Sequence, residues 1–382
     1  MEINNLEEQH RVLLTKAKRI VVKVGTRILV DKNGKPNHSS ITAITEQLAK
    51  LKKSGHEVLL VTSGAVGAGM QILGCKKRPT AIQDLQMAAA IGQVSLMNYY
   101  TACFTKWHCK IGQVLLTHAD LKSRERHLNA RNTILNLLQH GIIPVINEND
   151  VVSCDEIKIG DNDVLSALVT TLIDADLLII LTTPNGLRKP LKSGKTERVG
   201  YLPKIDKGAL ELVSSGKDQF GTGGMGSKLQ AAQIAALTGA LVVIASGKDH
   251  SVIKKVLQGA EVGTLIGNPK AANVICHRKR WIAFFHKPQG KLIIDQGAAH
   301  ALLEEGKSLL PIGVCEVEGK FSAGTVVNIF APTGENIGRG LIEYNIKEMQ
   351  QIKGKPSTEI AKILGYKNSD TVIHRDNMVL FG

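Results

Sequence analysis

The sequence contains no apolar run that could cross a membrane. None of its uninterrupted apolar stretches approaches the roughly 18 residues that a spanning helix needs. The first 18 residues carry Glu2, Glu7 and Glu8 and lack the apolar core of a secretory signal, so they predict no signal peptide. We expect a cytoplasmic protein without a membrane segment.

Cysteine is also scarce, and its spacing excludes two common kinds of site. The six cysteines are scattered, no C-x-x-C pair occurs, and no Cys/His spacing matches a zinc site. We therefore expect reduced thiols and no metal site built from protein side chains.

Charge is not scarce, because 48 Lys and Arg stand against 34 Asp and Glu, a formal net charge of +14. A basic chain raises nucleic acid as a partner, so the location of the charge matters. From Cys276 onward 14 basic residues meet 11 acidic ones, whereas the rest of the chain has 34 against 23. Most of the excess positive charge therefore lies before Cys276, and binding of a small anionic substrate explains this location as well as binding of RNA does.

Short β-branched segments alternate with helical patterns over the first two thirds of the chain. The segments are nearly all apolar, as expected of parallel strands covered on both faces. The expected strands are Arg19–Val24, Glu57–Thr62, Ile111–Thr117, Ile142–Asn147, Leu177–Thr182 and Leu241–Ala245. The expected helices are Ser40–Lys53, Pro79–Trp107, His127–Gln139, Asp163–Ile173 and Ser227–Leu237. This pattern predicts an α/β fold, a three-layer αβα sandwich that binds ligands at the carboxyl ends of its strands.

After about Gly259 the pattern changes to short strands separated by Gly and Pro. We expect strands at Lys291–Asp295, Gly313–Glu318 and Thr325–Ile329, after a boundary at Pro288-Gln289-Gly290. This part predicts a second, small β-rich domain.

A glycine-rich loop, Gly221-Thr222-Gly223-Gly224-Met225-Gly226-Ser227-Lys228, is the most informative motif. Backbone without side chains can approach a polyphosphate closely, and the helix that Ser227 opens favours an anion at its start. No strand precedes the loop, which excludes a dinucleotide-binding fingerprint, and Ser227 stands where a Walker A loop needs Lys. With Lys23 at the end of the first strand, Lys228 predicts a phosphoryl-transfer site; the alternative for the loop alone is a flexible linker.

Two further loops carry polar groups that suit an amino acid. Asn147-Glu148-Asn149-Asp150 ends one strand, and Asp161-Asn162-Asp163 opens the next helix. Helix capping explains one aspartate but not the whole set, which offers acceptors to an ammonium and donors to a carboxylate. Ser63-Gly64-Ala65 leads into a helix and exposes backbone N–H groups, although a plain tight turn explains it equally well.

Together these motifs resemble the glutamate 5-kinase family, which has the amino acid kinase fold and a C-terminal PUA domain. The resemblance rests on Val22-Lys23-Val24-Gly25-Thr26, Val61-Thr62-Ser63-Gly64-Ala65, Arg124–Arg131, Pro144–Asp150, Ile159–Asp163 and Gly221–Lys228, with Leu309-Leu310-Pro311 and Phe321–Gly324 in the second domain. It runs from about Arg19 to Asp376. It implies an N-terminal extension (1–18), a kinase domain (19–275), a linker (276–288), a PUA barrel domain (289–370) and a tail (371–382).

The resemblance implies ATP- and Mg²⁺-dependent phosphorylation of the γ-carboxylate of L-glutamate, the first step towards proline. It also implies a homo-oligomer, dimer or tetramer, and feedback inhibition by proline. Lys23 and Lys228 would contact phosphates, and Asp163 would hold both lysines. The glutamate site would comprise Ser63, Gly64, Asn147, Asp150 and Asn162. The nucleotide site would comprise Lys23, Thr182, Thr183, Thr222, Gly223, Gly224, Met225, Gly226, Ser227 and Lys228.

The sequence departs from the family pattern near the nucleotide, and two alternatives stay open. Thr183 stands where the family usually has Asp, Arg188 replaces a Tyr, and Arg27 replaces a Ser. A related kinase would act on N-acetylglutamate or aspartate. A PUA-type RNA-binding protein with impaired kinase activity is the other alternative, although the near-neutral C-terminal part argues against it.

Overall fold

The computed structural model describes residues 2–30, 36–75, 77–152, 162–191, 193, 195–205, 209, 224–268 and 288–381. The chain divides into two compact units, Met1–Val274 and Ile275–Gly382. Among the helices that these ranges contain, none is long and apolar enough to cross a bilayer.

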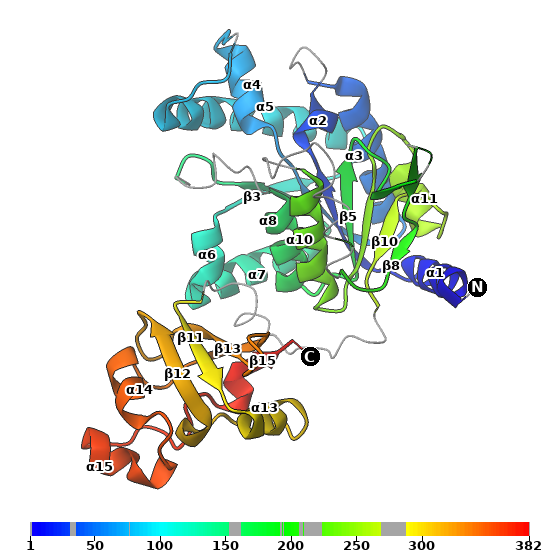
Figure 1. Cartoon of the computed structure of the whole chain (residues 1–382). Helices are drawn as coiled ribbons and strands as arrows, with labels where there is room; N and C mark the ends of the chain where they lie inside the picture. The colour runs from blue at the N-terminus through cyan, green and yellow to red at the C-terminus, as the bar shows by residue number, and fades with distance from the viewer. Residues whose placement is uncertain are drawn as a thin grey trace. The chain divides into compact units, whose positions relative to one another are not determined.

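An eight-stranded sheet forms the centre of the first unit, in the order β3-β4-β2-β1-β5-β9-β10-β8 (Figure 1). The strands are β1 (Arg19–Val24), β2 (Glu57–Val61), β3 (Ile111–Leu116), β4 (Ile143–Glu148), β5 (Leu177–Thr182), β8 (Tyr201–Leu202), β9 (Leu241–Ser246) and β10 (Thr264–Ile266). All neighbouring pairs are parallel except β9 with β10. The expected α/β fold is confirmed, and the six expected strands all lie in this sheet.

Helices cover both faces of this sheet. The described helices are α1 (Glu2–Leu14), α2 (Thr26–Leu29), α3 (His38–Lys53), α4 (Ala65–Ile72), α5 (Ile82–Thr105), α6 (His118–Lys122), α7 (Arg124–Gln139), α8 (Asn162–Leu172), α10 (Met225–Ala236) and α11 (Val252–Leu257). Helices α3, α5 and α11 share one hydrophobic core with the strands, whereas α8 and α10 pack together against β1, β5 and β9. Short strands β6 (Arg188–Pro190) and β7 (Thr196–Arg198) form a separate hairpin.

The alternation of side chains along β1 decides where its lysine points. Ile20, Val22 and Val24 belong to the core shared with α3, α5 and α11. Successive residues of a strand face opposite sides of its sheet. Lys23 therefore faces the other layer, where α8 and α10 lie, and it is only 5% exposed there.

Two glycines hold α4 and α5 in close contact. A Cβ added at Gly69 would lie 1.7 Å from the carbonyl oxygen of Ala88, and one at Gly92 would lie 1.9 Å from that of Ala65. Any larger side chain would push the helices apart, so the glycines fix the distance between them. This packing positions the loop that joins the two helices.

The second unit has a five-stranded sheet of its own, in the order β12-β11-β13-β14-β15. Its elements are β11 (Gly290–Ile294), α13 (Gln296–Leu303), β12 (Val314–Gly319), β13 (Val326–Phe330), β14 (Asn336–Leu341), α14 (Ile346–Ile352), α15 (Ile360–Leu364) and β15 (Met378–Leu380). Buried residues of the strands and helices make a core, which includes Leu292, Ile329 and Met349. The expected β-rich second domain is confirmed.

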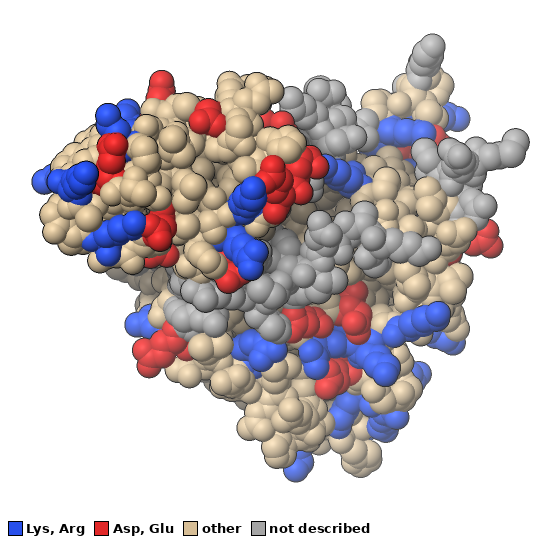
Figure 2. Space-filling view, turned by 90° about the horizontal axis from the view of Figure 1, so that it is seen from below, with Lys and Arg blue, Asp and Glu red and all other residues tan. Residues whose placement is uncertain are grey.

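On the face seen in Figure 2, basic and acidic side chains are interspersed and do not form a large patch of one sign.

Candidate active site

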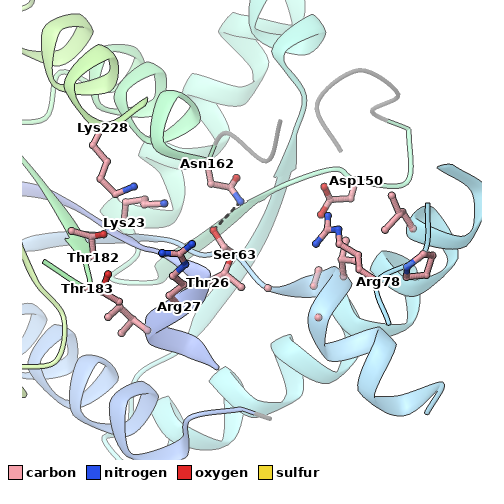
Figure 3. A pocket seen from close by; sticks show the side chains of 18 of the residues that line it. Lys23, Thr26, Arg27, Ser63, Arg78, Asp150, Asn162, Thr182, Thr183 and Lys228 are labelled. Carbon is pink, nitrogen blue, oxygen red and sulfur yellow. Dashed lines mark hydrogen bonds between the residues drawn. The ribbon is translucent and has the colours of Figure 1, made fainter. Parts of the chain in front are cut away.

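A cavity of about 550 Å³ opens at the carboxyl ends of β1, β2 and β5 (Figure 3). Lys23, Ser63 and Thr182 line it at or just after the ends of these strands. Asp150, which follows β4, lines it as well. Parallel strands bring these residues together because their carboxyl ends share one edge of the sheet.

Asp163 joins the two lysines that the sequence places 205 positions apart. Its Oδ1 accepts a hydrogen bond from Lys23 Nζ at 2.5 Å, and its Oδ2 accepts one from Lys228 Nζ at 3.0 Å. Ser227 Oγ donates to the same Oδ2 at 2.8 Å. All three charged groups are nearly inaccessible to solvent, so their attraction is weakly screened.

This cluster keeps Asp163 ionised. Burial by itself would raise the pKa of its carboxyl, but the charges of Lys23 and Lys228 outweigh burial and hold that pKa below its usual value. Asp163 also lies in the first turn of α8, where a negative charge complements the helix dipole. The carboxylate thus neutralises one of the two positive charges and leaves a net positive charge on the cluster.

The glycine-rich loop leads directly into α10. Gly224 is the residue before the helix, and Met225, Gly226 and Ser227 form its first turn. Lys228 Nζ also donates to the Gly224 carbonyl oxygen at 3.2 Å. Of these residues only Lys228 lines the cavity, and Thr222 and Gly223 lie outside the described residues.

A chain of amides links three elements on the other side of the cluster. Asn162 Nδ2 donates to Ser63 Oγ at 3.0 Å and to Asn147 Oδ1 at 3.1 Å. Asn147 Nδ2 donates in turn to Gln93 Oε1 at 2.9 Å. The Oδ1 atom of Asn162 is buried and accepts no hydrogen bond from a described group.

Ser63 and Gly64 present donors to the cavity. Gly64 has φ +100°, a conformation that glycine adopts without strain, and it caps the start of α4. The first backbone N–H groups of a helix have no partner within it, and Gly64, Ala65 and Val66 line the cavity. Because the Ser63 oxygen accepts from Asn162, its proton is free to donate to a ligand. These groups fit a carboxylate.

Asp150 and Arg78 lie at the far end of the cavity from the lysines (Figure 3). Burial raises the pKa of Asp150 to about 6, although the positive charge of Arg78 partly offsets this effect. An ionised Asp150 suits an ammonium, and a nearby arginine suits an anion.

Thr182 and Thr183 line the end of the cavity nearest the lysines, at the carboxyl end of β5. Arg27, from α2, points into the space between the lysines and Ser63 (Figure 3). The structure thus brings every described residue of the expected glutamate site into one region, with Asn147 behind Asn162 and the others in the cavity wall.

Sequence reasoning gave no role to Arg78 or Gln93. Arg78 lies in an irregular loop and Gln93 in the middle of the long helix α5. Neither residue belongs to a motif, so only the tertiary packing of α4 on α5 brings them to the site. The proline that follows Arg78 was the one local signal of an ordered loop position.

A polyphosphate fits the end of the cavity that holds the two lysines. Their ammonium groups supply donors for phosphate oxygens, and Gly25 leaves the backbone beside Lys23 uncovered. Within the described ranges no group of three His, Cys, Asp or Glu could hold a metal ion. A Mg²⁺ ion, which is commonly bound through substrate phosphates, needs no such group.

Comparison with known proteins agrees with both units. Residues 18–246 match the amino acid kinase family, and residues 290–364 match the PUA domain. Glutamate 5-kinase from Moorella thermoacetica is 43% identical over 379 residues, which cover 98% of this chain and all of that protein. The glutamate 5-kinase from Methylobacillus flagellatus is 47% identical over 372 residues, 96% of this chain and 99% of that protein.

Solved structures with a similar fold are more distant. UMP kinase from Bacillus anthracis matches with a TM-score of 0.45 and 14% identity, over 66% of this chain and 96% of that protein. Carbamate kinase from Giardia lamblia, solved with AMP-PNP, matches with a TM-score of 0.48 and 17% identity, over 66% and 99%.

Replacing Asp163 tests the buried cluster. We expect Asp163→Asn to lower the free energy of unfolding at pH 7 by about 3–5 kcal/mol, because two buried ammonium groups lose their anion. In the wild type this carboxylate stabilises the fold above its unfolded pKa of about 3.9, and that stabilisation is lost as the pH falls through the lower folded pKa. The stability of the variant should therefore also fall less than that of the wild type as the pH is lowered.

Urea unfolding between pH 7 and pH 3 measures both effects. Glu46→Gln, which breaks an exposed pair with Lys50 on α3, is the control and should cost about 0.3–0.5 kcal/mol. An Asp163→Asn protein as stable as this control would contradict the role assigned to the cluster.

Proposed function

This chain belongs to the amino acid kinase family, in its glutamate 5-kinase group, and from that premise we propose how its cavity transfers the γ-phosphoryl group of ATP to L-glutamate. The observation that carries the assignment of roles is the convergence of Lys23 and Lys228 on Asp163, beside groups that fit an amino acid. Phosphates bind at the lysine end, and glutamate extends from Ser63 towards Asp150. The alternatives, a kinase for another amino acid or an RNA-binding protein, are not favoured.

The nucleophile needs no activation by the protein. The γ-carboxylate of glutamate, with an ordinary pKa near 4.3, is ionised at neutral pH. One of its oxygens forms a bond to the γ-phosphorus of ATP while the bond from that phosphorus to the β,γ-bridging oxygen breaks, which yields glutamyl 5-phosphate and ADP. No proton moves in this step, so no general base is required.

Repulsion between two anions is the main obstacle, and the chain's fixed positive charges oppose it. Lys23 and Lys228 place ammonium groups beside the transferred phosphoryl group, where negative charge gathers in the transition state. The helix start at Gly64 and the Ser63 hydroxyl orient the attacking carboxylate. Mg²⁺, held through the phosphates of ATP, would neutralise part of their negative charge. Because Asp163 is held at short distance from both lysines, they need not reorganise during the reaction.

At the other end of the substrate, the Asp150 carboxylate accepts from the α-ammonium group. An acetylated amine carries no charge to pair with Asp150. This arrangement therefore favours free glutamate over N-acetylglutamate.

Proline inhibition has a physical basis in the same end of the cavity. We propose that proline competes with glutamate, since both present an ammonium beside a carboxylate while proline has no carboxylate to phosphorylate. Initial rates at several proline concentrations should show a raised KM for glutamate at unchanged kcat. An unchanged KM for glutamate would place any effect of proline elsewhere.

That the protein is a homo-oligomer, a dimer or a tetramer, stays a prediction that light scattering can test.

A cytoplasmic location also stays a prediction. ATP as substrate supports it, as do the free thiols of the described cysteines, Cys75, Cys103, Cys109 and Cys315. RNA contact through the PUA domain gains no support from the interspersed charges in Figure 2.

Removing either lysine tests the catalytic assignment. We expect Lys23→Ala and Lys228→Ala each to lower kcat about 10²–10³-fold, the usual cost of losing one preorganised donor to the transition state. Glutamate-dependent ADP formation with Mg²⁺ measures this. The control is Lys50→Ala, since Lys50 is exposed and paired with Glu46 away from the cavity. Near-normal turnover in a folded Lys228→Ala protein would refute the assignment.

The pH dependence of glutamate use tests Asp150. With a pKa of about 6, Asp150 is ionised at pH 8 and protonated at pH 5, so kcat/KM for glutamate should fall as the pH drops through 6. Asp150→Asn should remove this step and lower kcat/KM at pH 8 about 10–100-fold, the value of a hydrogen bond between charged groups. Initial rates at saturating ATP between pH 5 and pH 8 measure this pH dependence. If Asp150→Asn shows the same fall in kcat/KM near pH 6, the fall comes from another titrating group.

A further inference from the structure

Arg78 is a cation of the cavity wall for which the mechanism above has no use. It lies in the loop between α4 and α5 and lines the cavity opposite Lys23 and Lys228 (Figure 3). Its side chain is exposed and makes no hydrogen bond or ion pair with another described residue. Its guanidinium points towards Asp150 without a direct ion pair, yet it is close enough to lower the pKa of that carboxyl.

The charges of an amino acid explain why such an arginine is needed. Free glutamate carries an ammonium and two carboxylates, and the α-carboxylate stands one carbon away from the ammonium. Asp150 can take the ammonium, but it would repel the α-carboxylate. A cation beside Asp150 would offset that repulsion.

The other cations among the described residues of the cavity wall lie in the wrong place for this task. Lys23 and Lys228 are held on Asp163 at the phosphate end. Arg27 points between those lysines and Ser63 (Figure 3). Among the described residues, Arg78 is the cation that lines the cavity beside Asp150, and its planar fork can bind both oxygens of a carboxylate at once.

The fold holds Arg78 in place without using its side chain. Pro79 restricts the backbone of the residue before it to extended conformations. The loop is anchored by α4 and α5, which Gly69 and Gly92 hold in close contact. Because Gly64 caps the start of α4, one short helix connects the site for the γ-carboxylate with the loop that carries Arg78.

We propose that Arg78 binds the α-carboxylate of the amino acid substrate, so that Arg78 and Asp150 together recognise the zwitterionic end of glutamate. The inference rests on the proposed function. It makes Arg78 a specificity-determining residue, which distinguishes a free amino acid from one whose α-carboxylate is blocked.

A substrate that lacks only the α-carboxylate tests this directly. L-Isoglutamine, the α-amide of glutamate, keeps the γ-carboxylate and the ammonium. The wild type should prefer glutamate to isoglutamine by about 10–100-fold in kcat/KM, the value of one hydrogen-bonded charge pair. In Arg78→Gln, kcat/KM for glutamate should fall by about that factor, mainly through KM. The value for isoglutamine and the KM for ATP should change little, so the preference should be lost.

Two further variants control the measurement. Lys77→Gln removes the same charge one residue away, outside the cavity wall, and should keep the preference. Arg78→Lys keeps the positive charge but loses the planar guanidinium, so it should retain only part of the preference for glutamate over isoglutamine. Thermal unfolding of each variant checks that it is folded.

Three outcomes would overturn the inference, and they differ from one another. A glutamate preference that survives in Arg78→Gln means that the α-carboxylate binds elsewhere. An equal fall for both substrates means that Arg78 acts only by keeping Asp150 ionised. Wild-type protein without glutamate-dependent ADP formation removes the proposed function itself, and the inference with it.

Discussion

The active site depends on one buried carboxylate that holds two buried ammonium groups. Without Asp163, Lys23 and Lys228 would repel each other inside a poorly solvated layer and would turn towards solvent. With it, both lysines keep a fixed position and the cluster retains a net positive charge. In the proposed mechanism, structural stability and phosphate binding therefore rest on the same three side chains.

The cavity separates its charges according to the two substrates. Lys23 and Lys228 lie at the end proposed for the phosphates, and the Ser63 hydroxyl, the backbone donors at Gly64 and the Arg27 side chain lie in the middle, where the attacking carboxylate is proposed to approach. One group of each charge, the carboxylate of Asp150 and the guanidinium of Arg78, lines the far end, where we propose that the zwitterionic end of glutamate binds. The carboxyl ends of parallel strands and the packing of α4 on α5 bring these groups together.

Local patterns in the sequence were informative where chemistry and periodicity coincide. The apolar segments gave the six strands, and the lysines at Lys23 and Lys228 were recognisable because glycines stand beside both. Arg78 and Gln93 carried no such signal, since an arginine in a loop and a glutamine in a helix are ordinary surface residues. The short strands β8 and β10 were also missed, because two or three residues show no period.

By itself, the sequence determined the fold class, the two-domain organisation and the residue types of a phosphoryl-transfer site, because each follows from short-range patterns of apolar, glycine and charged residues. Apart from the contact of Asp163 with both lysines, which the family resemblance implied, only the tertiary structure decided which of these residues meet. The alternation of β1 turns Lys23 towards α8 and α10, and close helix packing brings Arg78 opposite Asp150. Contacts between residues distant in sequence depend on the packing of whole layers, which no local pattern encodes.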